Sequence, residues 1–337
     1  MYGNRDSENR INMNSAQTSS IIYSLVIPIY NEEENITQLY DRLSKVMNQL
    51  DLEAEIILVD DGSNDCSLAI IQELRKQDPR VKYVSLARNF GHQVAVTAGL
   101  NFVQGQAAIV MDADLQDPPE LVPDMLKKWR EGFQIVYAQR SARKHESWFK
   151  RLSIYIFYRI LKHLADVDIP MDTGDFCLMD RHVVEILNAM PERNRYVRGL
   201  RAWTGFRQTA LQYERDGRFA GESKYPFTKL ISLGMDGIVA FSRVPLRFAT
   251  FLGLITASFA IVMICLVIFW RLTDPDSQFI GFAMITVAIF FLGAVQLICM
   301  GILGEYIGRI YEEVKRRPIY TLKELGGLIN TPFPVEK

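Results

Sequence analysis

The sequence predicts an α/β domain with a parallel sheet, followed by a transmembrane hairpin of two helices. From Tyr23 onward, short apolar runs alternate with segments of helical spacing, which is typical of a parallel sheet with helices on both faces. Polar clusters follow several of these runs, as expected at the carboxyl ends of parallel strands. Two segments near the C-terminus lack any charged residue and are long enough to cross a bilayer.

Five apolar runs predict strands. Each is short and bounded by polar or turn-forming residues, which is typical of a strand buried in a parallel sheet. The predicted strands are residues 24–28, 56–59, 82–86, 107–111 and 133–137.

The segments between these runs predict helices that connect the strands by right-handed crossovers. Residues 32–50 have helical spacing, with Asn31 as the expected N-cap and acidic residues in the first turn. The other predicted helices are residues 67–76, 94–102 and 120–131.

Two uncharged segments predict membrane-spanning helices. Residues 248–270 and 279–304 each exceed the ~20 residues that a helix needs to cross a bilayer. The turn-rich stretch RLTDPDSQ separates them, so we expect a helical hairpin. The alternative is a pair of buried helices in a soluble domain.

Basic residues flank this hairpin on its outer sides, whereas the connecting loop carries Arg271 with Asp274 and Asp276. The flanking basic residues are Lys224, Lys229, Arg243, Arg247, Arg309, Lys315, Arg316 and Arg317. Because cytoplasmic flanks carry an excess of lysine and arginine, we expect the amino-terminal domain and both termini in the cytoplasm.

Residues 148–164 and 226–247 mix apolar side chains with sparse basic ones. Basic amphipathic segments lie in the membrane interface, and we expect that location here, with packing against the sheet as the alternative. The predicted organisation is a disordered tail (1–20), an α/β domain (21–225), an interfacial helix region (226–247), two spans (248–304) and a cytoplasmic C-terminal segment (305–337).

Composition excludes several classes of protein. The net charge of −1 argues against a nucleic-acid binder, which normally has a basic excess. The four cysteines are scattered and show no disulfide or zinc spacing, which fits a reduced cytoplasmic setting. Residues 1–20 are polar and lack the apolar core of a signal peptide.

Two carboxylates stand directly after the predicted strand 107–111. They are Asp112 and Asp114, and Gln116 follows. Carboxylates this close repel each other unless a positive group lies between them. Mg²⁺ is typically bound by one or two carboxylates together with substrate phosphates, so the motif predicts a metal-bound diphosphate. The alternative is a solvated loop.

Three polar clusters follow predicted strands: residues 28–32 (PIYNE), 60–63 (DDGS) and 112–116 (DADLQ). Because the carboxyl ends of parallel strands lie along one edge, we expect the clusters to converge on one crevice. The first strand is followed by neither G-x-G-x-x-G nor G-x-x-x-x-G-K-[ST]. That absence disfavours a dinucleotide dehydrogenase and a P-loop ATPase.

Basic residues appear where a diphosphate would need them. Arginine suits bidentate phosphate contacts, and lysine acts as a point charge. Arg195, Arg198 and Arg201 recur at a spacing that would place them on one face of a helix. The other candidates are Arg140 and Arg143, together with Arg218, Ser223 and Lys224 of the basic loop RFAGESKY. The alternative for each is a solvated surface or a contact with lipid headgroups.

Six motifs in order resemble the family 2 glycosyltransferases that act on polyprenyl phosphate. They are VIPIYNEEENI, VDDGSNDCS, LARNFGHQVAVTAGL, MDADLQDPPE, GDFCLMDR and GESKY, and two spans follow them. This group includes dolichyl-phosphate mannose synthases and bacterial bactoprenol glucosyltransferases, and the two-span tail is most similar to the second branch. The resemblance implies an integral protein of the bacterial inner membrane, with a GT-A-like, Rossmann-type nucleotide-binding domain on the cytoplasmic side.

The resemblance also implies roles for individual residues. Pro28, Tyr30, Glu32 and Asp61 match the nucleoside-binding positions, while Asp114 and Gln116 match the direct metal ligands of the D-x-D motif. Asp112 matches the first carboxylate of the D-x-D pair, and Arg140 matches a position near the sugar and phosphates. The basic loop that closes over the diphosphate is matched by Arg218, Ser223 and Lys224. Arg195 and Arg198 are expected to serve either the donor or the lipid phosphate.

The implied reaction is an inverting transfer of a sugar from a nucleotide donor to polyprenyl phosphate, with Mg²⁺ or Mn²⁺ as cofactor. The branch favours UDP-glucose, with GDP-mannose or a UDP-aminosugar as alternatives. A phosphate acceptor is already ionised near neutral pH, so no strong general base is needed.

Three further residues have open roles. We expect a helix-capping or base-proximal role for His92. Asp172 and Asp175 lie in an expected loop after the sheet, where they either approach the sugar or acceptor or form a structural turn.

Two other classes compete with the transferase. A processive polysaccharide synthase would need more spans and a Q-x-x-R-W motif, and the sequence contains neither. A non-enzymatic scaffold would have no reason to keep the D-x-D pair and the basic loop. Small residues in the spans allow close helix packing, so we expect a homo-oligomer; they are Gly281, Gly293, Gly301 and Gly304.

Overall fold

The structure is a computed structural model that describes residues 21–50, 52–140, 173–193, 195–213, 244–273 and 281–328. The predicted tail (1–20), the predicted interfacial segment 148–164 and residues 226–243 of the second interfacial segment lie outside the described residues.

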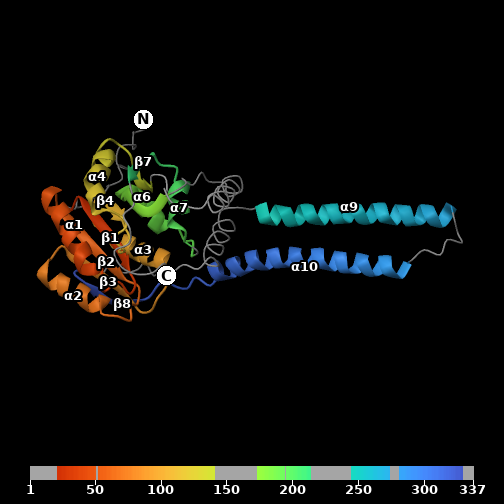
Figure 1. The fold of residues 1–337 in the computed structure, drawn as a ribbon, viewed down its shortest axis with the longest axis horizontal. Helices are drawn as coiled ribbons and strands as arrows, with labels where there is room; N and C mark the ends of the chain where they lie inside the picture. Colours follow the sequence, from red (N-terminus) through yellow and green to blue (C-terminus); the bar gives the residue numbers. More distant parts are fainter. Residues whose placement is uncertain are drawn as a thin grey trace, which may run out of the picture.

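Among the described residues, one mixed sheet of eight strands forms the centre of the domain (Figure 1). Its strand order is β7-β5-β6-β4-β1-β2-β3-β8. The strands are β1 (Tyr23–Ile29), β2 (Ala54–Asp60), β3 (Val81–Leu86), β4 (Ala107–Val110), β5 (Ile135–Arg140), β6 (Thr173–Asp180), β7 (Gln208–Tyr213) and β8 (Leu322–Gly326).

Most neighbouring strands are parallel, as predicted, but β6 and β8 run antiparallel to their neighbours. The prediction of a purely parallel sheet is therefore wrong at these two strands. β6 also replaces the loop expected around Asp175, because residues 173–180 pair with both β4 and β5.

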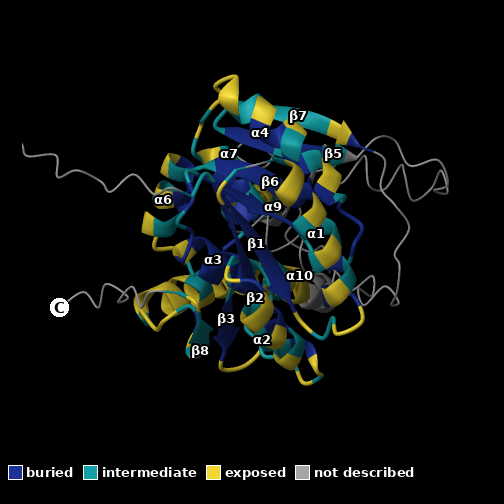
Figure 2. Cartoon of the chain, turned by 90° about the vertical axis from the view of Figure 1, so that its left-hand side faces the viewer, coloured by how far each residue is buried: buried dark blue, intermediate teal, exposed yellow. Residues whose placement is uncertain are grey.

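Helices cover both faces of this sheet, as the alternation of strands and helices predicted (Figure 2). The buried apolar residues form two clusters, one with α1, α2 and α4 and the other with α3, α6 and α7. Along β1, Leu25 and Ile27 belong to the first cluster and Val26 to the second, as the period of two requires. The helices are α1 (Ile36–Leu50), α2 (Ser67–Gln77), α3 (His92–Asn101), the short 3₁₀ turn η1 (Pro119–Leu121), α4 (Val122–Arg130), α6 (Arg181–Ala189) and α7 (Val197–Trp203).

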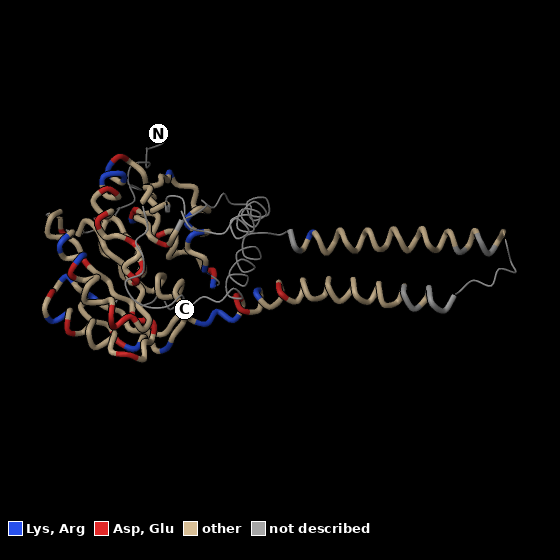
Figure 3. The backbone as a smooth tube through the Cα atoms, in the orientation of Figure 1, with Lys and Arg blue, Asp and Glu red and all other residues tan. Residues whose placement is uncertain are grey.

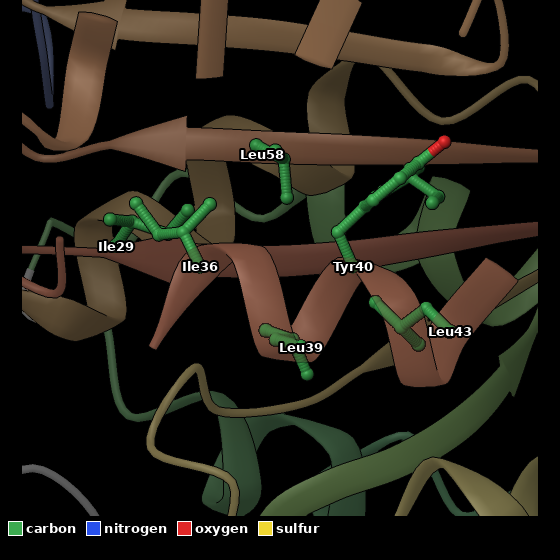
Figure 4. Close-up of a pocket in the computed structure, with 7 residues that line it drawn as sticks. Ile29, Ile36, Leu39, Tyr40, Leu43 and Leu58 are labelled. Atoms are coloured by element: carbon green, nitrogen blue, oxygen red, sulfur yellow. The ribbon is translucent and has the colours of Figure 1, made fainter. Parts of the chain in front are cut away.

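A small cavity lies where α1 packs on β1 and β2 (Figure 4). Its volume is about 10 Å³, which is close to the space of a single water molecule. The lining residues are Ile29, Ile36, Leu39, Tyr40, Leu43, Ile56 and Leu58. This space is a packing gap in the core, because it is too small and too apolar to hold a substrate.

The chain returns to the sheet after the second long helix. We call residues 319–328 the C-terminal strap. Its strand β8 pairs with β3, and the side chain of Tyr320 is only 3% exposed. The Tyr320 hydroxyl accepts a hydrogen bond from Asn101 Nδ2 at 2.9 Å, and Glu324 accepts hydrogen bonds from Tyr83 and Gln72. The strap therefore covers the edge of β3 that would otherwise be unpaired.

Two long helices, α9 (Val244–Thr273) and α10 (Gly281–Val314), extend side by side away from the domain (Figure 1). Their most apolar stretches, Leu246–Leu266 and Ala288–Val314, are 11% and 0% buried inside the protein. A core helix of a soluble protein would be mostly buried, so the exposure of these apolar surfaces favours the membrane-spanning interpretation. Charged residues are concentrated on the domain and at the domain-proximal ends of both helices (Figure 3).

Candidate active site

The ends of β1 and β2 are joined by hydrogen bonds between their loops. The backbone N–H of Asp61 donates to the Ile29 carbonyl at 2.8 Å, and the N–H of Asn31 donates to Ser63 Oγ at 3.1 Å. Asn31 has a φ of 54° and its Oδ1 accepts a hydrogen bond from the N–H of Asn64 at 2.8 Å. The predicted N-cap role of Asn31 is therefore wrong, since α1 begins five residues later. The side chain of Asn31 instead joins the two loops.

The carboxylate of Asp61 organises the loop that follows β3. It accepts hydrogen bonds from the backbone N–H groups of Phe90 at 2.7 Å and Gly91 at 2.9 Å. Burial raises the pKa of Asp61, although these two hydrogen bonds oppose the shift. Gly62 has a φ of 68°, and a Cβ there would lie 2.5 Å from the backbone carbon of Arg88. The DDGS turn therefore requires glycine at this position.

The predicted residues of the first cluster lie beside this turn. Pro28 is buried in β1, and Tyr30 follows the strand with 38% of its surface exposed. The N–H of Glu32 donates to Ser67 Oγ at 3.0 Å, and its carboxylate accepts a hydrogen bond from Asn35 at 2.6 Å. The first two predicted clusters thus meet at the carboxyl ends of neighbouring parallel strands, as the sequence indicated.

The D-x-D motif follows β4, which is the other neighbour of β1. Asp112 and Asp114 are partly exposed, whereas Ala113 and Leu115 are buried. The N–H of Gln116 donates to Asp114 Oδ1 at 3.1 Å. This hydrogen bond orients the carboxylate of Asp114, and the loop lies at the same edge of the sheet as Asp61.

Asp112 carries the clearest electrostatic signal of a ligand site. Burial raises its pKa to about 6, with a further increase from the charges of Asp175, Asp117 and Asp114, while His92 opposes the shift. Among the described residues, Asp112 Oδ1 is buried without a hydrogen-bond partner. A buried carboxylate oxygen that accepts no hydrogen bond and lies among other acids fits a hard divalent cation, so the residues present are compatible with the predicted metal.

A second cluster was not predicted from the sequence. His92 Nε2 lies 3.0 Å from Asp175 Oδ2 and 3.6 Å from Asp112 Oδ1. Burial opposes protonation of His92, but the hydrogen bond to Asp175 and the charge of Asp112 outweigh it and raise the pKa to about 9. Of the two roles expected for His92, helix capping is wrong, because Gly91 is the N-cap of α3 and the His92 ring bonds to Asp175 on β6.

The ligating atoms of His92, Asp112 and Asp175 all lie within 4.8 Å of one another, so this triad could also hold a metal ion. A histidine with a pKa near 9 is protonated at neutral pH and supplies a positive charge of its own. The described residues therefore offer two candidate metal sites, this triad and the oxygen ligands of the D-x-D loop.

The predicted arginines occupy different environments. Arg198, on α7, forms an ion pair with Asp175 at 2.7 Å. Arg195 precedes α7, is 8% exposed and donates to the Leu187 carbonyl, so it does not share a helix face with Arg198. Arg201 is 1% exposed and lies 5.6 Å from the ring centre of Tyr137.

Most of the remaining predicted site residues lie outside the part of the chain that the structure describes. The structure places Arg140 at the end of β5, and its backbone pairs with β7. The other predicted site residues, Arg143, Asp172, Arg218, Ser223 and Lys224, lie outside the described residues.

Comparison with known proteins places this site in a family. Residues 24–187 match the model of "Glycosyl transferase family 2". The uncharacterized glycosyltransferase YkcC of Bacillus subtilis (strain 168) is 46% identical over 92% of this chain and 96% of its own length. The prophage bactoprenol glucosyl transferase homolog of Escherichia coli (strain K12) is 39% identical over 90% of this chain and 98% of its own.

A third relative is the SfII prophage-derived bactoprenol glucosyl transferase of Shigella flexneri, which is 41% identical over 89% of this chain and 97% of its own length. These alignments include the acidic site on the sheet and the two long apolar helices. The chain is therefore a glycosyltransferase that belongs to glycosyl transferase family 2.

Proposed function

We propose that the protein transfers glucose from UDP-glucose to a polyprenyl phosphate, with inversion at the anomeric carbon, at the cytoplasmic face of a bacterial inner membrane. The observation that carries the proposal is the D-x-D pair at the end of β4, on a domain joined to two exposed apolar helices. Relatives of nearly full length are named for glucosyl transfer to bactoprenol, a polyprenyl lipid, which supports both the sugar and the acceptor.

The nucleoside is proposed to bind at the joined ends of β1 and β2. Asp61 is fixed there by the N–H groups of Phe90 and Gly91. Tyr30 follows the strand and presents an exposed ring, which suits stacking on a nucleobase. The proposed nucleotide-sugar contacts are Pro28, Tyr30, Glu32, Asp61, Asp112, Arg140 and Ser223.

The diphosphate is proposed to lie over the D-x-D loop. Asp114 and Gln116 would hold a divalent cation, Mg²⁺ or Mn²⁺, with Asp112 beside them. Such a cation, when bound, stabilises the negative charge of the departing nucleoside diphosphate. Arg140, Arg218 and Lys224 are the further catalytic candidates, because cations at these positions would stabilise the same charge.

The nucleophile in this reaction is an oxygen of the acceptor phosphate. Its second pKa is ~6, so the group is already largely ionised at neutral pH and needs no general base. The main tasks of the protein are to neutralise an anion that approaches an anionic donor and to align the two for in-line attack. Arg195 and Arg198 are the proposed phosphate-binding residues on the acceptor side or the donor side.

The helices α9 and α10 are proposed to anchor the enzyme where its lipid acceptor resides. Moving an isoprenoid chain into water costs ~0.8 kcal/mol per CH₂ group, so the site must come to the membrane. The basic flanks of the hairpin favour cytoplasmic placement of the domain and of both termini. A Cβ added at Gly293, Gly301 or Gly304 would meet no atom within 4 Å, so these positions leave room for a neighbouring helix and support a homo-oligomer.

A donor panel tests this proposal. Purified full-length protein in liposomes that contain undecaprenyl phosphate is incubated with Mg²⁺ and radiolabelled UDP-glucose, GDP-mannose or a UDP-aminosugar, and the lipid is extracted. We expect label in the lipid only with UDP-glucose. Transfer from GDP-mannose or the UDP-aminosugar alone would show that glucose is not the sugar transferred. A labelled polymer would indicate a processive synthase. No transfer from any donor would contradict the proposal.

A further inference from the structure

The carboxylate of Asp175 is surrounded by hydrogen-bond donors from two other elements. His92 Nε2 lies 3.0 Å from its Oδ2 atom, and Gln93 Nε2 donates to the same atom at 3.2 Å. Arg198 donates from Nε to Oδ1 at 2.7 Å and from Nη2 to Oδ2 at 3.2 Å. Four donors thus converge on one carboxylate, which is a strongly satisfied group.

A residue with such partners is poorly suited to accept a proton. Burial alone would raise the pKa of Asp175, but Arg198 and His92 outweigh burial and hold it well below its ordinary value. A general base works best when its pKa is near the operating pH. Both oxygens of Asp175 already accept hydrogen bonds from His92, Gln93 or Arg198, so its geometry favours a positioning role over that of a proton acceptor.

The exposure of the three side chains indicates which of them an incoming anion would meet. The side chain of Asp175 is 9% exposed, whereas those of Arg198 and His92 are 28% and 33% exposed. Arg198 and His92 therefore present accessible surface, and the carboxylate of Asp175 is more deeply buried than either.

A further contact fixes the geometry of this cluster. Gln93 Oε1 accepts a hydrogen bond at 2.9 Å from the backbone N–H of Val197, the first residue of α7. Gln93, at the start of α3, thus contacts both Asp175 on β6 and the first residue of α7. Arg198 comes next on α7, so its position is set through both its backbone and its ion pair.

The place of this cluster in the sheet separates it from the nucleoside side. The strand order is β6-β4-β1-β2, so β4 and its D-x-D loop lie between Asp175 and the β1–β2 loops that hold Asp61. His92 is 3.6 Å from Asp112, which places the cluster next to the reacting centre. A second substrate that attacks the donor from the side opposite the nucleoside would approach here.

We propose that His92 and Arg198 form the subsite for the acceptor phosphate and that Asp175 is a positioning residue that holds them in place. The inference rests on the proposed function and deepens it by naming the acceptor side. The ligand class is a phosphate monoester on an isoprenoid chain. Asp175 takes no proton in the reaction and touches the acceptor only through its two partners.

Steady-state kinetics with separate variation of donor and acceptor test this assignment. The variants are His92→Gln, Arg198→Lys and Asp175→Asn, with His182→Gln and Arg207→Lys as matched controls on exposed residues of the same domain. We expect the KM for undecaprenyl phosphate to rise about tenfold or more in each test variant, because each loses a hydrogen bond to a charged group. The KM for the donor should change less than about twofold, and the controls should match the wild type.

The double variant Asp175→Asn/Arg198→Lys distinguishes positioning from direct catalysis. If Asp175 acts through Arg198, the double variant should be no more than about threefold worse than the poorer single variant, because the two changes remove one interaction. Additive losses, or a fall in kcat for Asp175→Asn with an unchanged acceptor KM, would overturn the proposal and indicate a base. A rise in donor KM alone would assign the cations to the diphosphate.

Binding of farnesyl phosphate, measured by calorimetry in the absence of donor, tests the acceptor subsite independently of the proposed reaction. We expect the wild type to bind this short acceptor and the three variants to bind it about tenfold more weakly. If the wild type transfers no sugar yet shows this pattern, the reaction is wrong and the subsite stands. If binding is equal in all variants, the subsite is wrong even where transfer is observed.

Discussion

The carbonyl oxygen of Thr321 accepts a hydrogen bond from the backbone N–H of Ala87 at 2.9 Å. This contact joins the C-terminal strap, which follows α10, to the end of β3. The loop after β3 continues to Phe90 and Gly91, whose N–H groups hold Asp61. The long apolar helix α10 and the proposed nucleoside site are thus connected through the edge strand β8 and its neighbour β3.

Tyr320 is the main apolar anchor of this strap. Tyr320→Ala should lower the free energy of unfolding by about 3 kcal/mol, because it removes a buried aromatic side chain from the core. Tyr320→Phe should cost only about 1 kcal/mol, since it keeps the buried ring and loses the hydroxyl that accepts the hydrogen bond from Asn101. Thermal or denaturant unfolding in detergent measures both. Lys323→Ala, on the exposed side of β8, is the control; an equal loss there would contradict the role assigned to Tyr320.

The turn at Gly62 should be intolerant of any side chain. Gly62→Ala would combine a left-handed φ with a Cβ placed 2.5 Å from the backbone of Arg88, so the loop that holds Asp61 must move. We expect UDP to bind about tenfold or more weakly, measured by calorimetry, because that loop positions the nucleoside contact. Gly132→Ala is a matched control, since Gly132 also has a positive φ but open space around its Cβ position. Equal effects of the two changes would show that backbone strain alone is responsible.

The D-x-D loop should account for dependence on divalent cations. Asp114→Ala should lower transfer about 100-fold or more and abolish stimulation by Mg²⁺ or Mn²⁺, because the leaving diphosphate loses its counter-charge. Gln116→Ala should have a smaller effect of the same kind. Asp124→Ala, an exposed acid on α4, should behave like the wild type. Near-normal, metal-stimulated activity of Asp114→Ala would show that the metal is held elsewhere, for example by the triad of His92, Asp112 and Asp175.

The protonation of His92 predicts a pH dependence of stability. Its pKa is raised from 6.5 to about 9, so the folded protein binds this proton more tightly than the unfolded chain. The stabilisation is therefore complete below pH 6.5 and is lost as the pH rises through 9. The difference in melting temperature between the wild type and His92→Gln should shrink across this range. A constant difference from pH 6 to pH 10 would contradict the protonated state of His92 at neutral pH.

The orientation of the hairpin can be tested by cysteine labelling. Cys66 is exposed on the domain, so a membrane-impermeant maleimide should label it in inside-out vesicles and leave it unlabelled in intact spheroplasts. A Ser277→Cys variant that also carries Cys66→Ser should show the reverse, because residue 277 lies in the loop between the two predicted spans. Labelling of both positions from the same side would exclude a hairpin that crosses the bilayer twice.

Several features could be predicted from sequence because they depend on local pattern. Apolar runs located β1 to β5, and two long uncharged segments located α9 and α10. The polar clusters after β1, β2 and β4 were expected to converge because parallel strands share one carboxyl edge, and the pairing of β1 with β2 and β4 brings them together.

Other features could not be predicted because they depend on contacts between distant residues. Asp175 lies 83 residues from His92, and nothing in either local sequence indicates that they pair. The same holds for β6, whose position between β4 and β5 fixes an antiparallel strand in a mostly parallel sheet. The five-residue strand β8 has no distinctive pattern and forms only because β3 offers an edge.

The mass of the lipid product tests the central claim most directly. Undecaprenyl phosphate in proteoliposomes is incubated with the purified protein, UDP-glucose and Mg²⁺, and the extracted lipid is examined by mass spectrometry. The proposed reaction predicts undecaprenyl phosphate that carries one hexose, formed by the wild type and lost in Asp114→Ala. A lipid of unchanged mass, or a lipid that carries a chain of sugars, would contradict the account.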